Sequence, residues 1–228
     1  MTKADLVDRV TALGDLTRRD GEIIGPAAIL PIAEKSGLVS LIDQRVLELA
    51  LQRLAAEPDL RIAVNVSAAT LHSAGWIDRF AQALTIHPGV AGRLIVEITE
   101  TAANADIALT GRIIARMKKF GARIAMDDFG AGRTSFRSLR GLGVDVVKID
   151  GAFVQNIARS ADDRFFVRTL VDLARHLDVE TVAEWVEDAE ASRLLTGWGI
   201  DYLQGFHFGA ALIPATPGDA PVLAVAGR

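Results

Sequence analysis

The sequence predicts an α/β fold, a (β/α) barrel, and two patterns lead to this prediction. Short runs rich in β-branched residues alternate with longer segments whose apolar residues have helical spacing, which is typical of βαβ units and a parallel sheet. Polar and charged residues also stand at the C-terminal ends of these runs. In a closed parallel barrel the strand ends meet at one mouth, where functional residues gather. An open doubly wound sheet is the alternative, but it would not bring polar residues from so many strand ends to one point.

The expected strands are short runs of β-branched and other apolar residues. RIAVNVS and LIVEITE come first, RIAM ends at a pair of aspartates, and VDVVKI, TVA and YLQGF follow later in the chain. β-branched and aromatic side chains favour extended backbone because they pack well on a pleated surface. We therefore expect strands over residues 61–67, 94–100, 123–126, 144–149, 181–183 and 202–206.

The expected helices fill the intervals between these strands. Segment 164–177, for example, has apolar residues at Val167, Leu170, Val171 and Ala174, and this spacing of three and four residues places them on one face of a helix. The same periodicity predicts helices over residues 38–54, 76–84, 107–120, 164–177 and 188–195.

The composition fits one globular domain over residues 1–228. Half of the residues are hydrophobic (50%) and 24% are charged, so the chain can bury a substantial core. The formal net charge of -4, without a basic stripe, disfavours binding to a nucleic-acid polymer. The absence of cysteine excludes disulfides and thiolate chemistry and suits a reducing compartment.

We expect neither a membrane span nor a signal peptide in this chain. The most apolar stretch, Ile23–Ala33, contains Gly25, Pro26 and Pro31 and is shorter than the roughly 18 residues that a span needs. Acidic residues interrupt the N-terminal region, unlike in a signal peptide. A cytoplasmic domain is therefore expected.

The polar residues at the strand ends predict a metal site. They are Asn65, Glu97, Asp127, Asp128, Lys148, Asp150, Glu184 and Gln204. Carboxylates gathered at close range oppose one another's ionisation, and their oxygens suit a hard divalent cation. Taken singly, each residue has a simpler explanation as a turn former, a helix cap or a solvated surface residue. Only their joint arrangement favours a functional site.

Some of these residues have two interpretations. Adjacent residues of an extended chain point to opposite faces, so we expect one of Asp127 and Asp128 to face the mouth and the other to serve the following loop. Lys148 is either a solvated edge lysine or, beside carboxylates, a charge partner or an activator of water. Glu184 and Glu187 bracket a tryptophan, and a solvated helix start is the simpler explanation for that pair.

Short motifs along the chain resemble the ordered signature of one family. They are VNVS, EITE, DDFGAG, KID, AEWVE and DYLQGF, and they resemble those of EAL domains, the bacterial cyclic di-GMP phosphodiesterase family. The resemblance covers about residues 9–212, so residues 213–228, which are rich in Ala, Pro and Gly, are expected to form a loosely packed C-terminal tail. The resemblance implies a modified TIM (β/α)8 barrel whose first strand runs antiparallel, with Mg²⁺ or Mn²⁺ ions in its pocket.

The resemblance also implies roles for residues of these motifs. The implied metal ligands are Asn65, Glu97, Asp127, Asp128 and Glu184; the implied catalytic set is Lys148, Glu184 and Glu187; and Asp150 and Gln204 are implied ligand-binding residues. Glu100 matches the residue that holds the flexible loop after DDFG, a loop that also helps to form the family's homodimer. Bridged metal ions can activate a water and neutralise a phosphodiester during in-line displacement, which would give the linear dinucleotide.

Several positions depart from the family's pattern. Thr11-Ala12-Leu13 stands where the family has Glu-Ala-Leu, so Thr11 replaces a metal-binding glutamate, and Asp15 replaces an arginine that contacts the ligand phosphate. Further departures are Trp185 for the usual Gly, Arg133 for Tyr and Ala210 for Arg. Because these changes gather at one mouth, they favour impaired hydrolysis.

The sequence leaves competing functional hypotheses. We favour a degenerate EAL domain, catalytically impaired, that acts in bacterial cyclic di-GMP signalling as a regulatory sensor or a protein-interaction module. In this hypothesis cyclic di-GMP and the metal bind weakly or not at all, and a protein partner is expected. An active Mg- or Mn-dependent cyclic di-GMP phosphodiesterase is the alternative. A structural barrel without any ligand is a third hypothesis, and the retained metal positions oppose it.

Overall fold

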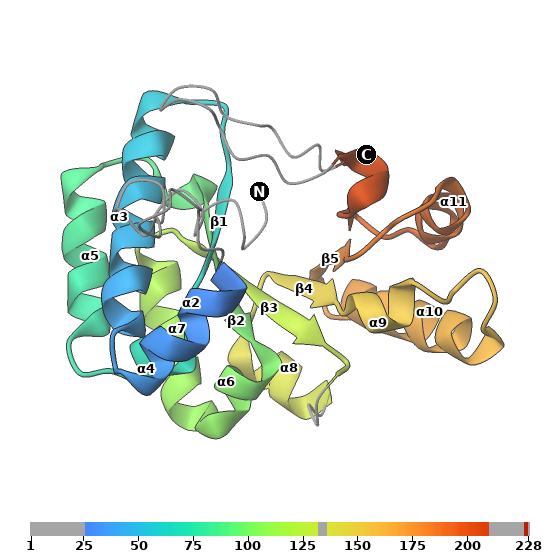
Figure 1. The fold of residues 1–228 in the computed structure, drawn as a ribbon, viewed down its shortest axis with the longest axis horizontal. Coiled ribbons are helices and arrows are strands. Elements are labelled where there is room, and N and C mark those ends of the chain that lie inside the picture. Colours follow the sequence, from blue (N-terminus) through green and yellow to red (C-terminus); the bar gives the residue numbers. More distant parts are fainter. Residues whose placement is uncertain (1–25, 132–135, 210–225, 228) are drawn as a thin grey trace. The chain divides into compact units, whose positions relative to one another are not determined.

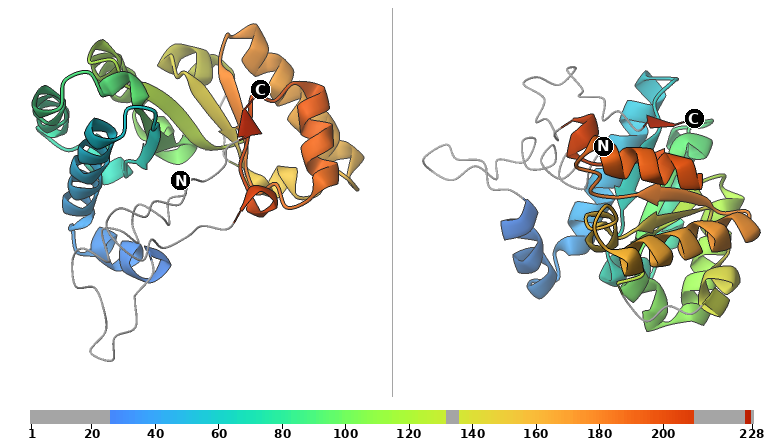
Figure 2. Two further views of the ribbon diagram at one scale, coloured as in Figure 1. Left: turned by 90° about the horizontal axis from the view of Figure 1, so that it is seen from above. Right: turned by 90° about the vertical axis from the view of Figure 1, so that its right-hand side faces the viewer.

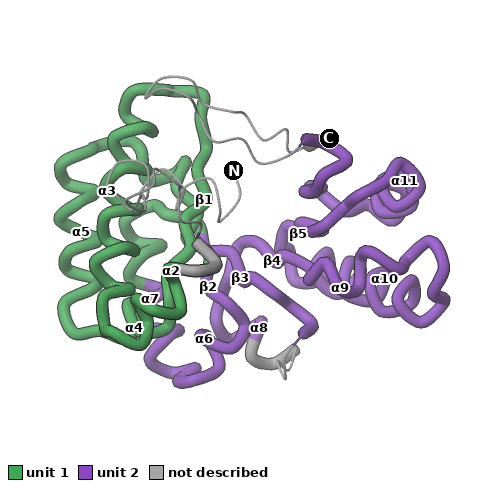
Figure 3. Tube along the Cα trace, viewed as in Figure 1, with its two compact units in different colours: residues 1–97, 116–123, 211–222 green, residues 98–115, 124–210, 223–228 purple. Residues whose placement is uncertain are grey.

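The computed structural model describes residues 26–131, 136–209 and 226–227 (Figure 1). These residues belong to two compact units (Figure 3). Unit 1 comprises residues 1–97, 116–123 and 211–222, and unit 2 comprises residues 98–115, 124–210 and 223–228. Thr11, Asp15, Arg133, Ala210 and the expected antiparallel first strand lie outside the described residues.

Unit 1 contains β1, the start of β2 and the helices that precede and separate these two strands. Its elements are α2 (Pro26–Lys35), α3 (Val39–Ala56), β1 (Ile62–Asn65), α4 (Ala68–Leu71), α5 (Trp76–Ile86), the 3-10 helix η1 (Ala91–Arg93) and the first residues of β2 (Leu94–Thr99). β1 pairs in parallel with β2, with Asn65 opposite Glu97. The register therefore brings two of the predicted site residues side by side at the ends of neighbouring strands.

The core of unit 1 forms around α3, which packs against β1, α4 and α5. Its buried face includes Val46, Leu47, Ala50, Leu51 and Leu54, at the spacing expected for one side of a helix. The guanidinium group of Arg93 donates hydrogen bonds to the carbonyl oxygens of Leu54, Glu57 and Leu60. The bonds to Leu54 and Glu57 satisfy carbonyl groups at the C-terminal end of α3, and the bond to Leu60 fixes the loop that follows the helix.

Unit 2 continues the alternation of strands and helices. Its elements are α6 (Glu100–Ala105), most of α7 (Ile107–Lys119), β3 (Arg123–Phe129), α8 (Phe136–Leu142), β4 (Val146–Ile149), α9 (Gly151–Val154), α10 (Ala161–His176), β5 (Glu180–Ala183), α11 (Ala189–Trp198), β6 (Tyr202–Leu203), the 3-10 helix η2 (Phe206–Phe208) and β7 (Ala226–Gly227). Strands β3 to β6 pair in parallel in chain order, and β7 pairs antiparallel with β6. The C-terminal ends of β3, β4, β5 and β6 therefore lie along one edge.

Helix α10 covers the strands of unit 2 and shows how the sequence sets the element boundaries. Its side chains Val167, Leu170, Val171 and Ala174 are buried, and the helix packs against β4 and β5 (Figure 2). The hydroxyl of Ser160 accepts a hydrogen bond from the backbone amide of residue 163, and this cap starts the helix. The apolar stripe predicted from the sequence is thus the buried face of the helix.

The predicted alternation of strands and helices is confirmed in the described part of the chain. Helices occur at each segment where periodicity predicts one, and parallel strands separate them. None of the helices in the described ranges combines the length and the apolar character that a membrane crossing requires. The α/β class of the fold is therefore as expected.

Candidate metal centre

Three adjacent strands of unit 2 bring charged side chains together at their C-terminal ends. Asp127 and Asp128 lie near the end of β3, Lys148 is the third residue of β4, and Glu184 follows the last residue of β5. Because these strands are parallel and neighbours, their C-terminal ends share one edge. The structure thus brings together four of the residues predicted from the sequence.

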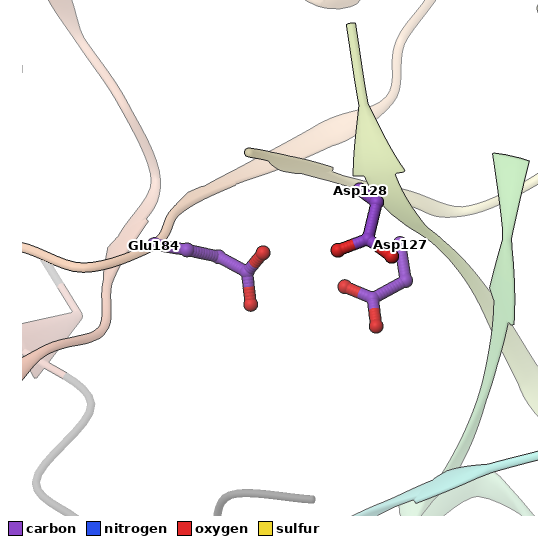
Figure 4. A group of neighbouring side chains, drawn as sticks. All are labelled: Asp127, Asp128 and Glu184. Carbon is purple, nitrogen blue, oxygen red and sulfur yellow. The ribbon is translucent and has the colours of Figure 1, made fainter. Parts of the chain in front are cut away.

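The three carboxylates point toward one another (Figure 4). Each offers one oxygen, and these oxygens all lie within 4.8 Å of one another. Asp127 and Glu184 are buried, with 4% and 9% of their surfaces exposed, whereas Asp128 is exposed. A cation at this position would therefore reach two ligands in the protein interior and a third from the solvent side.

A distortion of β3 places both aspartates in the cluster. Adjacent residues of a regular strand point to opposite faces, and this led us to expect only one of the pair at the mouth. The register between β3 and β4 shifts between Met126 and Phe129, and Asp128 has a left-handed backbone with φ 56°. This bulge turns the second carboxylate toward the first. Both aspartates of the implied ligand set therefore lie in the cluster, and the interpretation in which one of them serves only the loop does not hold.

Lys148 joins two of the three carboxylates. Its Nζ lies 2.8 Å from Asp127 Oδ1 and 2.8 Å from Glu184 Oε1, and only 7% of its side chain is exposed. With all four groups ionised, three carboxylates and one ammonium leave two uncompensated negative charges, which one divalent cation would balance. Lys148 is thus a buried charge partner, not a solvated edge residue.

The chemistry of this cluster fits a hard divalent cation. Mg²⁺ and similar ions take oxygen ligands and are commonly held by one or two carboxylates together with water. Asp127, Asp128 and Glu184 supply three such groups from two strand ends. The ammonium of Lys148 already bonds to two of them, so a metal ion has to share these oxygens with it or displace it.

Two further predicted ligands form a pair in unit 1. The side-chain amide of Asn65 donates to Glu97 Oε2 at 3.1 Å, and Glu97 is only 8% exposed although it lies among apolar residues of β2. The amide therefore partners a carboxylate in an otherwise apolar setting. Their role as metal ligands stays a prediction.

Glu100 holds the start of the loop that follows β3. It is 2% exposed, and its Oε2 accepts a hydrogen bond from the backbone amide of Gly130 at 3.1 Å. Gly130 has φ 102°, and a Cβ there would lie 3.0 Å from the Phe166 ring. Only glycine fits this backbone comfortably, so Glu100 and Gly130 together fix where the chain leaves the bulge.

The remaining predicted residues have local partners. Asp150 caps α9, because its Oδ1 accepts from the backbone amide of Ala152 at 2.8 Å. Glu187 is exposed and accepts a hydrogen bond from Gln155 Nε2 at 3.0 Å. The backbone of Gln204 makes two hydrogen bonds: its amide donates to the carbonyl of Ala183, and its carbonyl accepts from the amide of residue 186. Their roles toward a ligand stay predictions.

Trp185 stands next to Glu184 in an unusual conformation. Its backbone is left-handed, with φ 53°, and 53% of its surface is exposed. The side chain lies against Gly151, where a Cβ would come within 2.1 Å of the indole. Left-handed backbone costs a residue other than glycine about 1–2 kcal/mol. The glycine that the family usually has here would avoid this cost.

The contacts of Gly151 and Gly205 were not predicted from the sequence. A Cβ at Gly205 would lie 2.2 Å from the backbone nitrogen of Val186, so the two chain segments approach each other closely. Both glycines directly follow motif residues, Asp150 and Gln204. Their position inside the motifs was the available signal, since glycine at such places often allows close backbone approach.

A parallel α/β sheet with an acidic cluster at the C-terminal edge of its strands defines a (β/α) protein with a candidate metal centre, and comparison with known proteins gives the family. The model of the EAL domain family matches residues 3–211. The chain is 35% identical over 192 residues to the cyclic di-GMP phosphodiesterase PdeF of Escherichia coli (strain K12), covering 82% of this chain and 26% of that protein.

A second relative and two solved structures are also similar to this chain. The chain is 36% identical over 192 residues to the bifunctional diguanylate cyclase/cyclic di-GMP phosphodiesterase MucR of Pseudomonas aeruginosa, covering 82% of this chain and 28% of MucR. The PaMucR phosphodiesterase in its c-di-GMP complex superposes with a TM-score of 0.81 at 34% identity, over 86% of this chain and 81% of that one. The FimX EAL domain from Pseudomonas aeruginosa bound to c-di-GMP superposes with a TM-score of 0.79 at 24% identity, over 85% of this chain and 79% of that one. At this identity the comparison supports the fold alone.

The chain therefore belongs to the EAL domain family, as its motifs predict. Its fold is the predicted α/β class, a modified TIM barrel. The chain spans only 26% and 28% of the lengths of PdeF and MucR.

Proposed function

We propose that this domain acts in bacterial cyclic di-GMP signalling as a catalytically impaired EAL domain, a regulatory sensor or a protein-interaction module. The observation that carries the proposal is a contrast within the motifs. The carboxylates Asp127, Asp128 and Glu184 form a cluster that suits a cation, whereas Thr11 and Asp15 stand where the family has a metal-binding glutamate and a phosphate-binding arginine.

Both substitutions weaken a site for an anionic ligand held through a metal ion. Threonine at position 11 removes a negative oxygen ligand, and aspartate at position 15 changes the local charge by two units against a phosphate. Two unit charges about 4 Å apart interact by on the order of 4 kcal/mol at an effective dielectric constant of 20. Even a fraction of this energy corresponds to a large loss of affinity or rate, because about 1.4 kcal/mol is a factor of ten.

A metal ion, Mg²⁺ or Mn²⁺, would be held by Asp127, Asp128 and Glu184, with Asn65 and Glu97 as further ligands by resemblance. A divalent ion lowers the pKa of a bound water and neutralises a phosphodiester. In this proposal Lys148 bonds to the buried carboxylates Asp127 and Glu184 and orients them. Asp150, Glu187 and Gln204 are proposed to contact or support the ligand.

The alternative function is an active Mg- or Mn-dependent cyclic di-GMP phosphodiesterase. One observation favours it, namely that Lys148 and the three carboxylates are already assembled at one strand edge. The names of PdeF and MucR, two relatives with more than a third of their aligned residues identical, describe this activity for those proteins. Water or Asp15 would then take the place of the missing glutamate ligand.

Turnover of cyclic di-GMP in the presence of Mn²⁺ separates the two functions. We expect the native chain to hydrolyse it at least ~10-fold more slowly than an intact relative, since the loss of one such interaction costs about 1.4 kcal/mol or more of transition-state stabilisation. The double variant Thr11→Glu with Asp15→Arg should be faster than the product of the single effects predicts, because both changes act on one bound phosphodiester. Rapid turnover by the native chain would establish the alternative instead.

The proposal includes the remaining expectations about the whole protein. We propose a single EAL domain over residues 1–228, with a core at about 9–212 and a loosely packed tail at 213–228. A cytoplasmic location, a protein partner and a homodimer built around the loop after DDFG belong to the same proposal. The homodimer rests on the resemblance, and the contact of Glu100 with Gly130 fixes the start of the loop that would build it.

A further inference from the structure

Trp185 combines three properties that packing alone does not explain. It is a large aromatic residue with 53% of its surface exposed, its backbone is left-handed, and its indole lies directly on Gly151. A tryptophan that served the hydrophobic core would be buried. A position that only required left-handed backbone would be occupied most favourably by glycine. Strained backbone of this kind persists where the surroundings hold it and concentrates at functional sites.

The backbone next to Trp185 and the indole itself each have a fixed neighbour. The backbone amide of Val186 donates to the carbonyl of Gln204 at 3.0 Å, and the amide of His207 donates to the carbonyl of Val186 at 3.0 Å. These bonds fix the segment after β5 alongside the segment after β6. The indole lies against Gly151, the first residue of α9. The backbone that carries the ring is therefore held by the segment after β6, and the ring itself rests on the segment after β4.

The indole also stands beside the candidate metal centre. Trp185 directly follows Glu184, which belongs to the carboxylate cluster and bonds to Lys148. Gly151, beneath the ring, directly follows Asp150 at the C-terminal end of β4. An exposed aromatic surface and a cation-binding cluster thus occur together at the ends of β4 and β5. Phosphate and a planar base are the two chemical parts of a nucleotide that such surfaces bind.

We infer that Trp185 is a base-stacking residue, on which a guanine ring of a cyclic dinucleotide lies while the phosphates face the carboxylate-bound cation. The inference rests on the proposed role of this domain in cyclic di-GMP signalling and adds a contact made by a residue that stands where the family usually has glycine. Trp185 then offsets part of the affinity lost at Thr11 and Asp15, and it favours base-containing ligands over simple phosphodiesters.

Tryptophan fluorescence gives a direct readout of this contact. The chain has three tryptophans; Trp76 is 1% exposed and Trp198 is partly buried, so Trp185 is the most exposed of the three. Addition of cyclic di-GMP in Mn²⁺ buffer should quench the native emission and protect it from acrylamide. Dimethyl phosphate, which supplies a phosphodiester without any aromatic ring, should compete only weakly for the site.

Substitutions of Trp185 distinguish an indole that stacks on the base from one that obstructs the site. Calorimetry should show that Trp185→Phe binds cyclic di-GMP within about threefold of the native chain, whereas Trp185→Gly binds at least about fivefold more weakly, the lower end of the effect of losing one stacked base. Phe165→Ala is the matched control, because Phe165 is an aromatic residue with 75% exposure on α10, and its removal should leave binding unchanged.

A second pair of variants tests the position of the ring without removing it. Gly151→Ala adds a methyl group where the indole lies, so it should displace the ring and weaken binding in the native background. In the Trp185→Gly background the same change should have no further effect. Additive effects of the two substitutions would mean that Gly151 acts independently of the indole, which would overturn the positioning part of the inference.

The remaining outcomes are also decisive. Tighter binding by Trp185→Gly would show that the indole obstructs the site, and equal binding would show that it is a bystander; each result overturns the inference. A native chain that binds no cyclic di-GMP overturns both the inference and the sensor function. Rapid hydrolysis by the native chain, with binding that still depends on Trp185, would overturn the impaired function and leave the stacking role intact.

Discussion

Replacement of Lys148 by methionine tests whether the carboxylate cluster is a cation site. Methionine keeps a long unbranched side chain but removes the ammonium that lies 2.8 Å from both Asp127 and Glu184. Breaking a buried ion pair by removing one partner typically costs about 3–5 kcal/mol, because the other charge stays buried. For a chain of this size each kcal/mol lowers the melting temperature by about 2–4 °C, so we expect a decrease of roughly 6–20 °C without metal.

Divalent metal should then reverse part of this loss. In the native protein Mn²⁺ has to share Asp127 and Glu184 with the ammonium, whereas in Lys148→Met both oxygens are open to the ion. Binding at a hundredfold excess over the dissociation constant stabilises a folded protein by about 2.7 kcal/mol. Thermal unfolding in EDTA and in Mn²⁺ should therefore show a larger metal-dependent increase in melting temperature for the variant than for the native chain.

Two controls make the result specific. Lys119→Met removes an exposed lysine at the end of α7, and surface changes of this kind usually stay within about 0.5 kcal/mol. The double variant Asp127→Asn with Lys148→Met removes one carboxylate together with the ammonium, so it should be less destabilised than Lys148→Met and should lose most of the rescue by Mn²⁺. An equal effect of Mn²⁺ on the native and Lys148→Met chains would refute the reasoning.

Three further measurements follow from the described contacts. Asp127→Asn should abolish Mn²⁺ binding in calorimetry, whereas Asp172→Asn, at an exposed carboxylate paired with Arg175, should leave it unchanged. Glu100→Ala should lower the free energy of unfolding by about 1–3 kcal/mol because the amide of Gly130 loses its acceptor, and Glu100→Gln, which keeps an acceptor, should cost less. Sedimentation should show a concentration-dependent dimer, and a strictly monomeric chain would contradict the proposed homodimer.

The elements could be predicted well from the sequence because periodicity and composition act locally. Helices α3, α5, α7, α10 and α11 all lie where apolar spacing placed them. Helix α10 nevertheless begins at Ala161, before the expected residue 164, because Ser160 supplies a cap that the apolar pattern does not contain. Helix α2 was not among the predicted helices, because the stretch that contains Pro26 and Pro31 was weighed only as a membrane span. Proline is tolerated at the first helical position, and Pro26 occupies that position.

Within the candidate site, the sequence indicated which side chains the structure brings together, but not the geometry that does so. Asp127, Asp128, Lys148 and Glu184 could be named because each lies at a strand end, which the β-branched runs reveal. The bulge that brings the two aspartates together could not be read from the sequence, since it depends on how β3 registers against β4. The contact between the indole of Trp185 and Gly151 is likewise tertiary, because the two residues follow different strands.

Backbone strain supports the proposal that the cluster is functional. In the described part of the chain, the non-glycine residues with left-handed backbone are Asp128, Asp178 and Trp185. Asp178 lies just past the end of α10, where left-handed residues commonly end helices. The other two lie at the carboxylate cluster, Asp128 in the bulge of β3 and Trp185 directly after Glu184. Glycine at either position would relieve about 1–2 kcal/mol of strain.

The substitution Asp128→Gly tests whether this strain serves the metal site. It should leave the metal-free protein at least as stable as the native chain, because relief of strain and of charge repulsion exceeds the entropy of about 0.4–1 kcal/mol that glycine adds to the unfolded chain. It should also weaken Mn²⁺ binding, because one of three carboxylates is lost. Asp178→Gly relieves the same strain away from the cluster and should leave Mn²⁺ affinity unchanged. If Asp128→Gly destabilises the protein and spares Mn²⁺ binding, the left-handed aspartate serves the fold, and the cluster does not need its carboxylate to hold the ion.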